Sequence, residues 1–208
     1  ELEKIKGGVQ QNIPFHYDRA KFFLSANSVG LFAVSKCPND GYFELQLPKI
    51  PGEILKQCID LFRYMAFQYD KSCCYEVTCQ IYFDAEHMEY EVYVPEQFVA
   101  PITCRVLKKR PVEECRGKIL VMDFHSHHIM APFPSLIDNE DEIGCQLYAI
   151  CGDMRKDGDM AYTLYVRAGA FGKWLELATD TVFEEPEVLP SRDFQLEQAE
   201  LNKIRTEI

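Results

Sequence analysis

The chain has 208 residues and a formal net charge of −11, with 47% hydrophobic and 12% aromatic residues. This length and composition predict a globular chain with one domain and a substantial extension. No apolar run approaches the roughly 18 residues of a membrane span, so no membrane partner is expected. The only basic cluster is Lys108-Lys109-Arg110, which we expect in a solvated turn. The acidic excess therefore argues against nucleic acid as the main partner.

Cysteine usage predicts a reducing compartment. Nine cysteines are scattered singly apart from Cys73-Cys74, without a disulfide framework or a CxxC metal pattern. The odd count, and an N-terminus without a secretory signal pattern, predict reduced thiols and a cytoplasmic location. Five of the cysteines lie in apolar contexts, which is typical of core positions rather than of nucleophiles: Cys58, Cys79, Cys104, Cys145 and Cys151.

The predicted elements follow an α/β order. Residues 1–49 are expected to form a small N-terminal β extension, with strand-like pieces at 21–24, 29–34 and 41–47. A helix is predicted at 51–67, where apolar residues recur at helical spacing. The later elements are strands at 74–83, 90–94, 98–106 and 118–124, a short helix near 138–144, and strands at 145–151, 161–167 and 170–177. The tail, 186–208, is expected to begin extended and to finish as a helix capped at Ser191, either docked or disordered.

The most informative motif follows the apolar run 118–124, which predicts a buried strand. It consists of His125-x-His127, seven residues, Ser135, two residues and Asp138. Side chains alternate across a strand, so both imidazoles project to one face. Two imidazoles and one carboxylate suit tetrahedral Zn²⁺, with an open position for a water whose pKa falls to roughly 7. We therefore expect one hydrolytic zinc site per chain.

This motif resembles that of the JAMM metallopeptidases, also called JAB or MPN domains, and residues 123–142 are similar to their prokaryotic branch. The resemblance implies that His125, His127 and Asp138 bind zinc and that Ser135 helps to hold the oxyanion. It also implies a catalytic domain at 50–185, built as a mixed sheet flanked by helices and related to the cytidine-deaminase fold. Pro134 departs from the family, in which an aromatic residue often precedes the serine.

The general base implied by the resemblance is Glu76, which follows the first long helix at the start of a strand. The family usually has a Gly-rich strand after this glutamate, whereas this chain has Thr78-Cys79-Gln80. The acidic stretch 84–91 offers other candidates in an expected solvated hairpin, with the last of them on the outer face of the next strand: Glu86, Glu89 and Glu91.

Structural interpretations of the same residues stay open. Ser135 is also a plausible helix N-cap with Asp138 in the first turn, and the two roles are compatible. If the strand persists, His128 points to the face opposite to His127, so we do not expect it to be a ligand. His16 and His87 lie in polar surroundings and are expected to be ordinary surface or partly buried histidines.

The substrate expectation comes from the family resemblance alone. The N-terminal β extension and residues 167–172 look like the protein A subgroup of the PRTRC gene systems, where ubiquitin-like proteins and activating enzymes are encoded nearby. The resemblance thus implies cleavage of a peptide or isopeptide bond at the tail of a ubiquitin-like protein or its conjugate. Two alternatives remain: a non-catalytic MPN-like scaffold, and a RadC-like, DNA-associated protein that shares the motif spacing.

Overall fold

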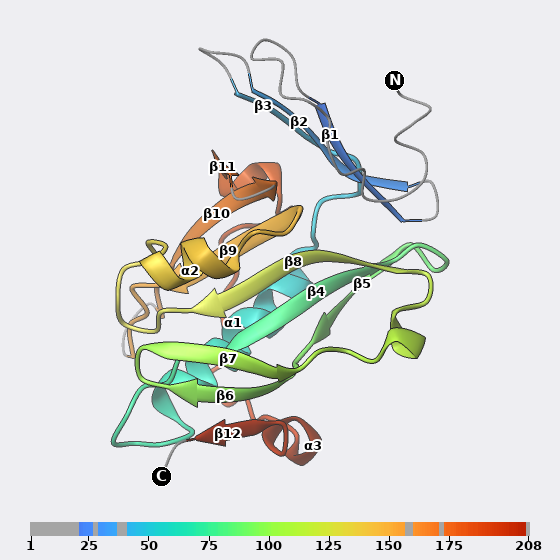
Figure 1. The fold of residues 1–208 in the computed structure, drawn as a ribbon. Helices are drawn as coiled ribbons and strands as arrows, with labels where there is room; N and C mark the ends of the chain where they lie inside the picture. Colours follow the sequence, from blue (N-terminus) through green and yellow to red (C-terminus); the bar gives the residue numbers. More distant parts are fainter. Residues whose placement is uncertain (1–20, 27–28, 37–40, 157–159, 171–172, 207–208) are drawn as a thin grey trace.

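The computed structural model describes residues 21–26, 29–36, 41–156, 160–170 and 173–206, and these residues form a mixed α/β fold (Figure 1). The central sheet has the strand order β11-β10-β9-β8-β4-β5. Its strands are β4 (Thr78–Asp84), β5 (Glu89–Tyr93), β8 (Lys118–Ser126), β9 (Gln146–Gly152), β10 (Thr163–Ala170) and β11 (Lys173–Leu177). The sheet is mixed because β8 and β9 are parallel while every other neighbouring pair is antiparallel.

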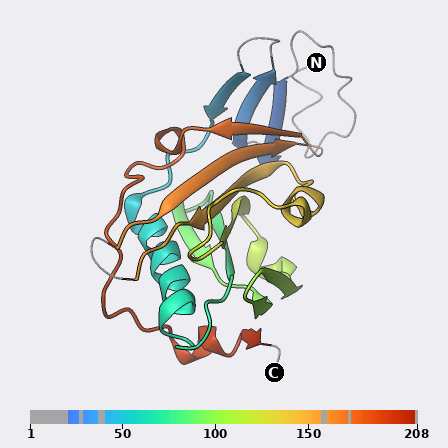
Figure 2. The ribbon, with the colours of Figure 1, turned by 90° about the vertical axis from the view of Figure 1, so that its left-hand side faces the viewer.

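Two helices lie on opposite faces of this sheet (Figure 2). The long helix α1 (Gly52–Phe67) matches the predicted helix and supplies much of the buried core. Its Phe62 ring packs edge-on against Phe124 of β8, with ring centroids 4.8 Å apart. Because neighbouring side chains on a strand point to opposite faces, His125 points away from α1. The short helix α2 (Leu136–Asp141) lies on that second face.

A second sheet, β12-β6-β7, contains β6 (Glu96–Ala100), β7 (Thr103–Lys108) and β12 (Ile204–Thr206). The prediction of one strand at 98–106 was wrong, because a turn at Pro101 and Ile102 folds this run into a β6–β7 hairpin. The predicted tail helix at Ser191 was also wrong. Ser191 donates from its backbone N and its Oγ to the Asp60 carboxylate of α1, which docks the tail in an extended conformation. Between Ser191 and residue 206, the end of the described chain, α3 (Gln198–Leu201) is the only helix, and β12 pairs in parallel with β6.

The remaining described elements are short. The strands β1 (Lys21–Ala26), β2 (Val29–Lys36) and β3 (Gly41–Leu45) form an antiparallel sheet within the predicted N-terminal extension. Single 3-10 turns occur at Val112–Cys115 and Thr179–Thr181. His16 lies outside the described residues. Of the helices in the described ranges, none combines the length and the apolar character that crossing a membrane requires.

The basic cluster is not simply a solvated turn, which corrects the prediction for Arg110. Its guanidinium stacks on the rings of Tyr82 and Tyr93, at 4.7 Å and 4.9 Å from their centroids. It also pairs with Glu91, whose other carboxylate oxygen lies 2.6 Å from Lys118 Nζ. The long arginine side chain therefore buries its stem and stacks its charge on aromatic rings instead of extending into water.

Candidate metal centre

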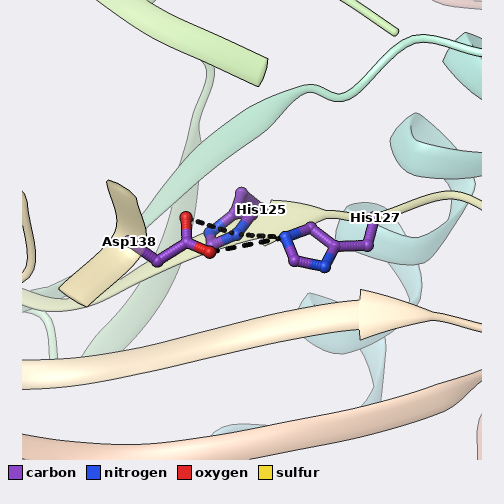
Figure 3. A group of neighbouring side chains, drawn as sticks. All are labelled: His125, His127 and Asp138. Carbon is purple, nitrogen blue, oxygen red and sulfur yellow. Dashed lines mark hydrogen bonds and ion pairs between the residues drawn. The ribbon is translucent and has the colours of Figure 1, made fainter. Parts of the chain in front are cut away.

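Three potential metal ligands converge at the end of β8 (Figure 3). His125 and His127 come from the end of this strand and the residue after it, and Asp138 comes from the first turn of α2. The His125 and His127 Nε2 atoms lie 3.2 Å apart. Asp138 approaches them with Oδ1 at 3.3 Å from His125 Nε2 and Oδ2 at 3.6 Å from His127 Nε2. The structure thus brings together the three residues predicted as ligands.

The donor set and its spacing fit a small tetrahedral cation. Bonds of about 2.0–2.1 Å to nitrogen and oxygen ligands place the corners of a tetrahedron about 3.3 Å apart. The three observed separations, 3.2, 3.3 and 3.6 Å, are close to this value. Two imidazoles and one carboxylate could therefore hold a metal ion with little rearrangement.

The second nitrogen of His127 supports this orientation. His127 Nδ1 lies 3.2 Å from the carbonyl oxygen of Ala131, so a proton on Nδ1 leaves Nε2 free to act as a ligand. Burial lowers the pKa of His125 to about 4 and keeps its imidazole neutral near pH 7. Burial also opposes protonation of His127, but contacts with Asp138 and Glu76 raise the pKa of this residue overall.

Asp138 and Ser135 form a reciprocal cap at the start of α2. Asp138 N donates to Ser135 Oγ at 3.1 Å, and Ser135 N donates to Asp138 Oδ2 at 2.6 Å. Burial raises the pKa of Asp138, yet the two histidines and the bonds to Ser135 outweigh it and hold the pKa below its usual range. The predicted N-cap is confirmed, and the same carboxylate faces the imidazoles.

Glu76 lies on the same side of the sheet as the ligands. Thr78 pairs with His125, and Ser126 N donates to Val77 O at 3.0 Å, which continues the antiparallel alignment past the start of β4. Glu76 is therefore opposite His127, and cross-strand neighbours share a face. The side chain is 5% exposed. Burial raises its pKa to about 7, with His127 opposing the rise and Asp138 adding to it.

The other glutamates considered for the base lie elsewhere. Glu86 and Glu89 are exposed at the β4–β5 turn, and Glu91 is held by Arg110 and Lys118. Glu76, by contrast, interacts electrostatically with His127 and Asp138.

The strand does not persist to His128, because β8 ends at Ser126, and His128 is not part of the ligand group. His128 has a φ of 40° and does not continue the strand alternation. Its buried ring accepts a hydrogen bond from Ile129 N and contacts the Pro101 carbonyl oxygen through Nε2, at 2.7 Å. This residue links the loop after the ligands to the β6–β7 turn. His87 is largely exposed and pairs with Asp84, as expected for a surface histidine.

Two features around the site were not predicted. Gly152 permits close packing of the loop after His127: a Cβ at this position would lie 2.3 Å from Met130 O and 2.8 Å from Pro132 N. A buried ion pair between Arg167 and Glu142 lies at the other end of α2. The sequence signal for the pair was weak, because an arginine in a predicted strand and a glutamate in an acidic run each have an ordinary surface interpretation.

No protein-family model matches the chain, and a search of curated proteins found no match.

Proposed function

We propose that this protein is a zinc-dependent hydrolase of the JAMM type that cleaves a peptide or isopeptide bond. The observation that carries the proposal is the convergence of His125, His127 and Asp138, with spacing that suits tetrahedral zinc. A mixed sheet with helices on both faces is compatible with a JAMM fold. Zinc is favoured over magnesium or calcium because two of the three ligand atoms are imidazole nitrogens.

The residues around the ligands can supply the remaining chemistry. Zinc, when bound, polarises a carbonyl and lowers the pKa of water. In the proposed reaction the Glu76 carboxylate accepts a proton from the attacking water and passes it to the departing amine, which is general base and then general acid catalysis. The Ser135 hydroxyl lies at the same helix end as Asp138 and can donate a hydrogen bond to the developing oxyanion.

The surface around this centre suits a polypeptide substrate. Between the second and third ligands, and just after them, the chain exposes a group of large apolar side chains, with Phe133 70% and Leu136 82% exposed. The group consists of Ile129, Met130, Phe133, Leu136, Ile137 and Ile143. Exposed apolar side chains of this kind can contribute to protein-binding sites. The family resemblance adds the tail of a ubiquitin-like protein as the expected substrate.

The test is a cleavage assay with ubiquitin-like proteins that carry a reporter after a C-terminal glycine. We expect release of the reporter by the zinc-loaded protein, loss of release after chelation, and recovery when zinc is restored. A matched fusion with the same reporter after a ubiquitin-like protein that lacks its flexible tail should stay intact. A protein that binds zinc and cleaves none of a broad panel of peptide and isopeptide fusions would instead support the scaffold alternative.

A further inference from the structure

The helix that carries Asp138 is short and lacks an apolar anchor. All residues of α2, Leu136–Asp141, are described, and none of them is buried. Its two large apolar side chains, Leu136 and Ile137, are exposed. A helix of one and a half turns is not stable by itself in water, so contacts with the rest of the protein must fix its position.

At the C-terminal end of the helix, one buried arginine of β10 makes two of these contacts. Arg167 Nε donates to Glu142 Oε2 at 2.6 Å, and Nη2 lies 2.5 Å from the same oxygen. Arg167 Nη1 donates to Asn139 Oδ1 at 2.7 Å. The two side chains of the ion pair are almost inaccessible, with Arg167 3% and Glu142 7% exposed. The planar guanidinium thus binds the residue after Asp138 and the residue that ends the helix.

Trp174 completes this arrangement from the neighbouring strand β11. Its ring stacks with the Arg167 guanidinium at 4.6 Å, and its Nε1 donates to the backbone oxygen of Glu142 at 3.0 Å. Glu142 N in turn donates to Asp138 O at 2.9 Å. A continuous set of contacts therefore runs from the sheet through Arg167 and Glu142 to the backbone of Asp138.

The sheet register explains why Arg167 lies under α2. Tyr148 of β9 pairs with Arg167 on one side and with Asp123 of β8 on the other. Cross-strand partners share a face, and residues two apart on a strand share it too. Arg167 therefore occupies the same face as Asp123 and His125, directly on the metal side of the sheet.

We propose that Arg167 is a positioning residue, which fixes Asp138 in the metal site by holding the C-terminal end of α2 to the sheet. The inference rests on the proposed metal site and adds a determinant of its affinity. Because a lysine ammonium carries its donors on one nitrogen, it cannot reproduce the separate contacts of Nε with Glu142 and of Nη1 with Asn139, so Arg167→Lys should loosen this end of the helix.

The experiment measures zinc affinity by competition with a chromophoric chelator, together with the melting temperature of the metal-free protein. The matched control is Arg110→Lys, because Arg110 also stacks on aromatic rings and pairs with a glutamate but does so on the β4–β5 side of the sheet. We expect Arg167→Lys to weaken zinc binding about 10- to 100-fold, the effect typical of residues that orient metal ligands. Arg110→Lys should lower the melting temperature and leave zinc affinity unchanged.

Two further measurements separate positioning from a general loss of stability. Glu142→Gln should weaken zinc binding as well. The double variant Arg167→Lys/Glu142→Gln should bind zinc no more weakly than the weaker-binding single variant, since both changes break the same Arg167–Glu142 contact. The visible absorption of the Co²⁺-substituted protein should change in Arg167→Lys and stay as in the parent in Arg110→Lys, because it reports the ligand arrangement.

The outcomes test the metal site and the positioning role of Arg167 separately. A parent chain that binds no zinc would overturn the metal site, and with it this role for Arg167. A parent that binds zinc, with equal affinities in Arg167→Lys and Arg110→Lys or an unchanged Co²⁺ spectrum, would overturn only the positioning role.

Discussion

Glu76 and His127 lie opposite each other where the segment before β4 runs beside the end of β8. The pairing places a buried carboxyl next to a ligand that is distant in the sequence. Because the alignment depends on hydrogen bonds between backbones, the position of Glu76 does not require a long flexible side chain to find the site. A carboxyl fixed in this way by its backbone lies beside the proposed ligands before any metal binds.

Removal of a ligand should abolish metal binding. We expect about one zinc per chain in the parent, and a large loss in His125→Ala or Asp138→Ala, since two remaining ligands cannot close the coordination shell. Metal analysis after dialysis provides the measurement. His87→Ala is the matched control, because His87 is an exposed histidine outside the site. Full zinc content in both ligand variants would show that the ion is held elsewhere.

Replacement of the base should separate binding from turnover. Glu76→Gln keeps the size of the side chain but cannot accept the proton of water, so kcat should fall about 10²- to 10⁴-fold with zinc content unchanged. Glu86→Gln, at the exposed turn, should behave as the parent. Equal rates for Glu76→Gln and the parent would exclude Glu76 as the base.

Ser135 has a structural role that is visible and a catalytic role that is proposed. If it acts only as the N-cap, Ser135→Ala should cost about 1 kcal/mol of stability and leave the rate per folded molecule nearly unchanged. If it also donates to the oxyanion, kcat should fall by about 10²-fold or more. We expect the larger effect on kcat, with zinc content intact. Ser135→Thr, which retains a hydroxyl, should preserve more of the rate; an unaltered kcat in Ser135→Ala would leave only the capping role.

The raised pKa of Glu76 predicts a pH-dependent difference in stability. Burial raises this pKa from 4.5 to about 7. A group whose pKa is higher in the folded than in the unfolded protein contributes stability that is fully present below the unfolded-state pKa. This stability is lost as the pH rises through the folded-state pKa. The lowered pKa of His125 changes the stability in the opposite direction over a similar pH range. Because the parent and Glu76→Gln both contain His125, their melting temperatures must be compared at each pH. The melting temperature of metal-free Glu76→Gln should therefore rise relative to the parent between about pH 5 and about pH 8.

Glu86→Gln is the control for this comparison. The difference in melting temperature between Glu86→Gln and the parent should stay constant over this pH range, because the Glu86 carboxyl is exposed and is not buried next to the ligands. A constant difference between Glu76→Gln and the parent across this pH range would mean that Glu76 titrates as an ordinary glutamate.

Gly152 should be sensitive to a single methyl group. A Cβ at this position would overlap the backbone of Met130 and Pro132, so Gly152→Ala must displace the loop whose Ala131 carbonyl contacts His127 Nδ1. We expect a loss of about 1–3 kcal/mol in stability together with weaker zinc binding. Gly117→Ala is the control, because Gly117 has a φ of 74° but open space around it. If Gly117→Ala weakened zinc binding as much as Gly152→Ala, the loop argument would be wrong.

Local patterns predicted the parts of the fold that depend on neighbouring residues. The apolar spacing of 51–67 predicted α1, and the strand before His125 predicted that both imidazoles share a face. Ser135 and Asp138 predicted the start of α2, because capping uses residues only three apart. The order of elements predicted the α/β class of the fold.

The missed features depend on contacts between distant segments. The pairing of β12 with β6, the docking of Ser191 on Asp60 and the burial of Arg167 under α2 each join residues far apart in the chain. No local pattern encodes such partners. The β6–β7 hairpin is different, since Pro101 interrupts the run and cannot donate a hydrogen bond in a sheet, so this signal was available in the sequence.

The parallel pairing of β12 with β6 has a consequence for biosynthesis. A ribosome releases Glu96–Ala100 well before Ile204–Thr206, so β6 remains unpaired on that side until almost all of the described chain has emerged. The hairpin of which β6 is part contacts His128, next to the proposed ligands, through Pro101. During synthesis, an open strand edge would thus lie close to the nascent metal centre. Such edges promote association with other chains, so we expect newly made protein to be prone to association until β12 pairs with β6.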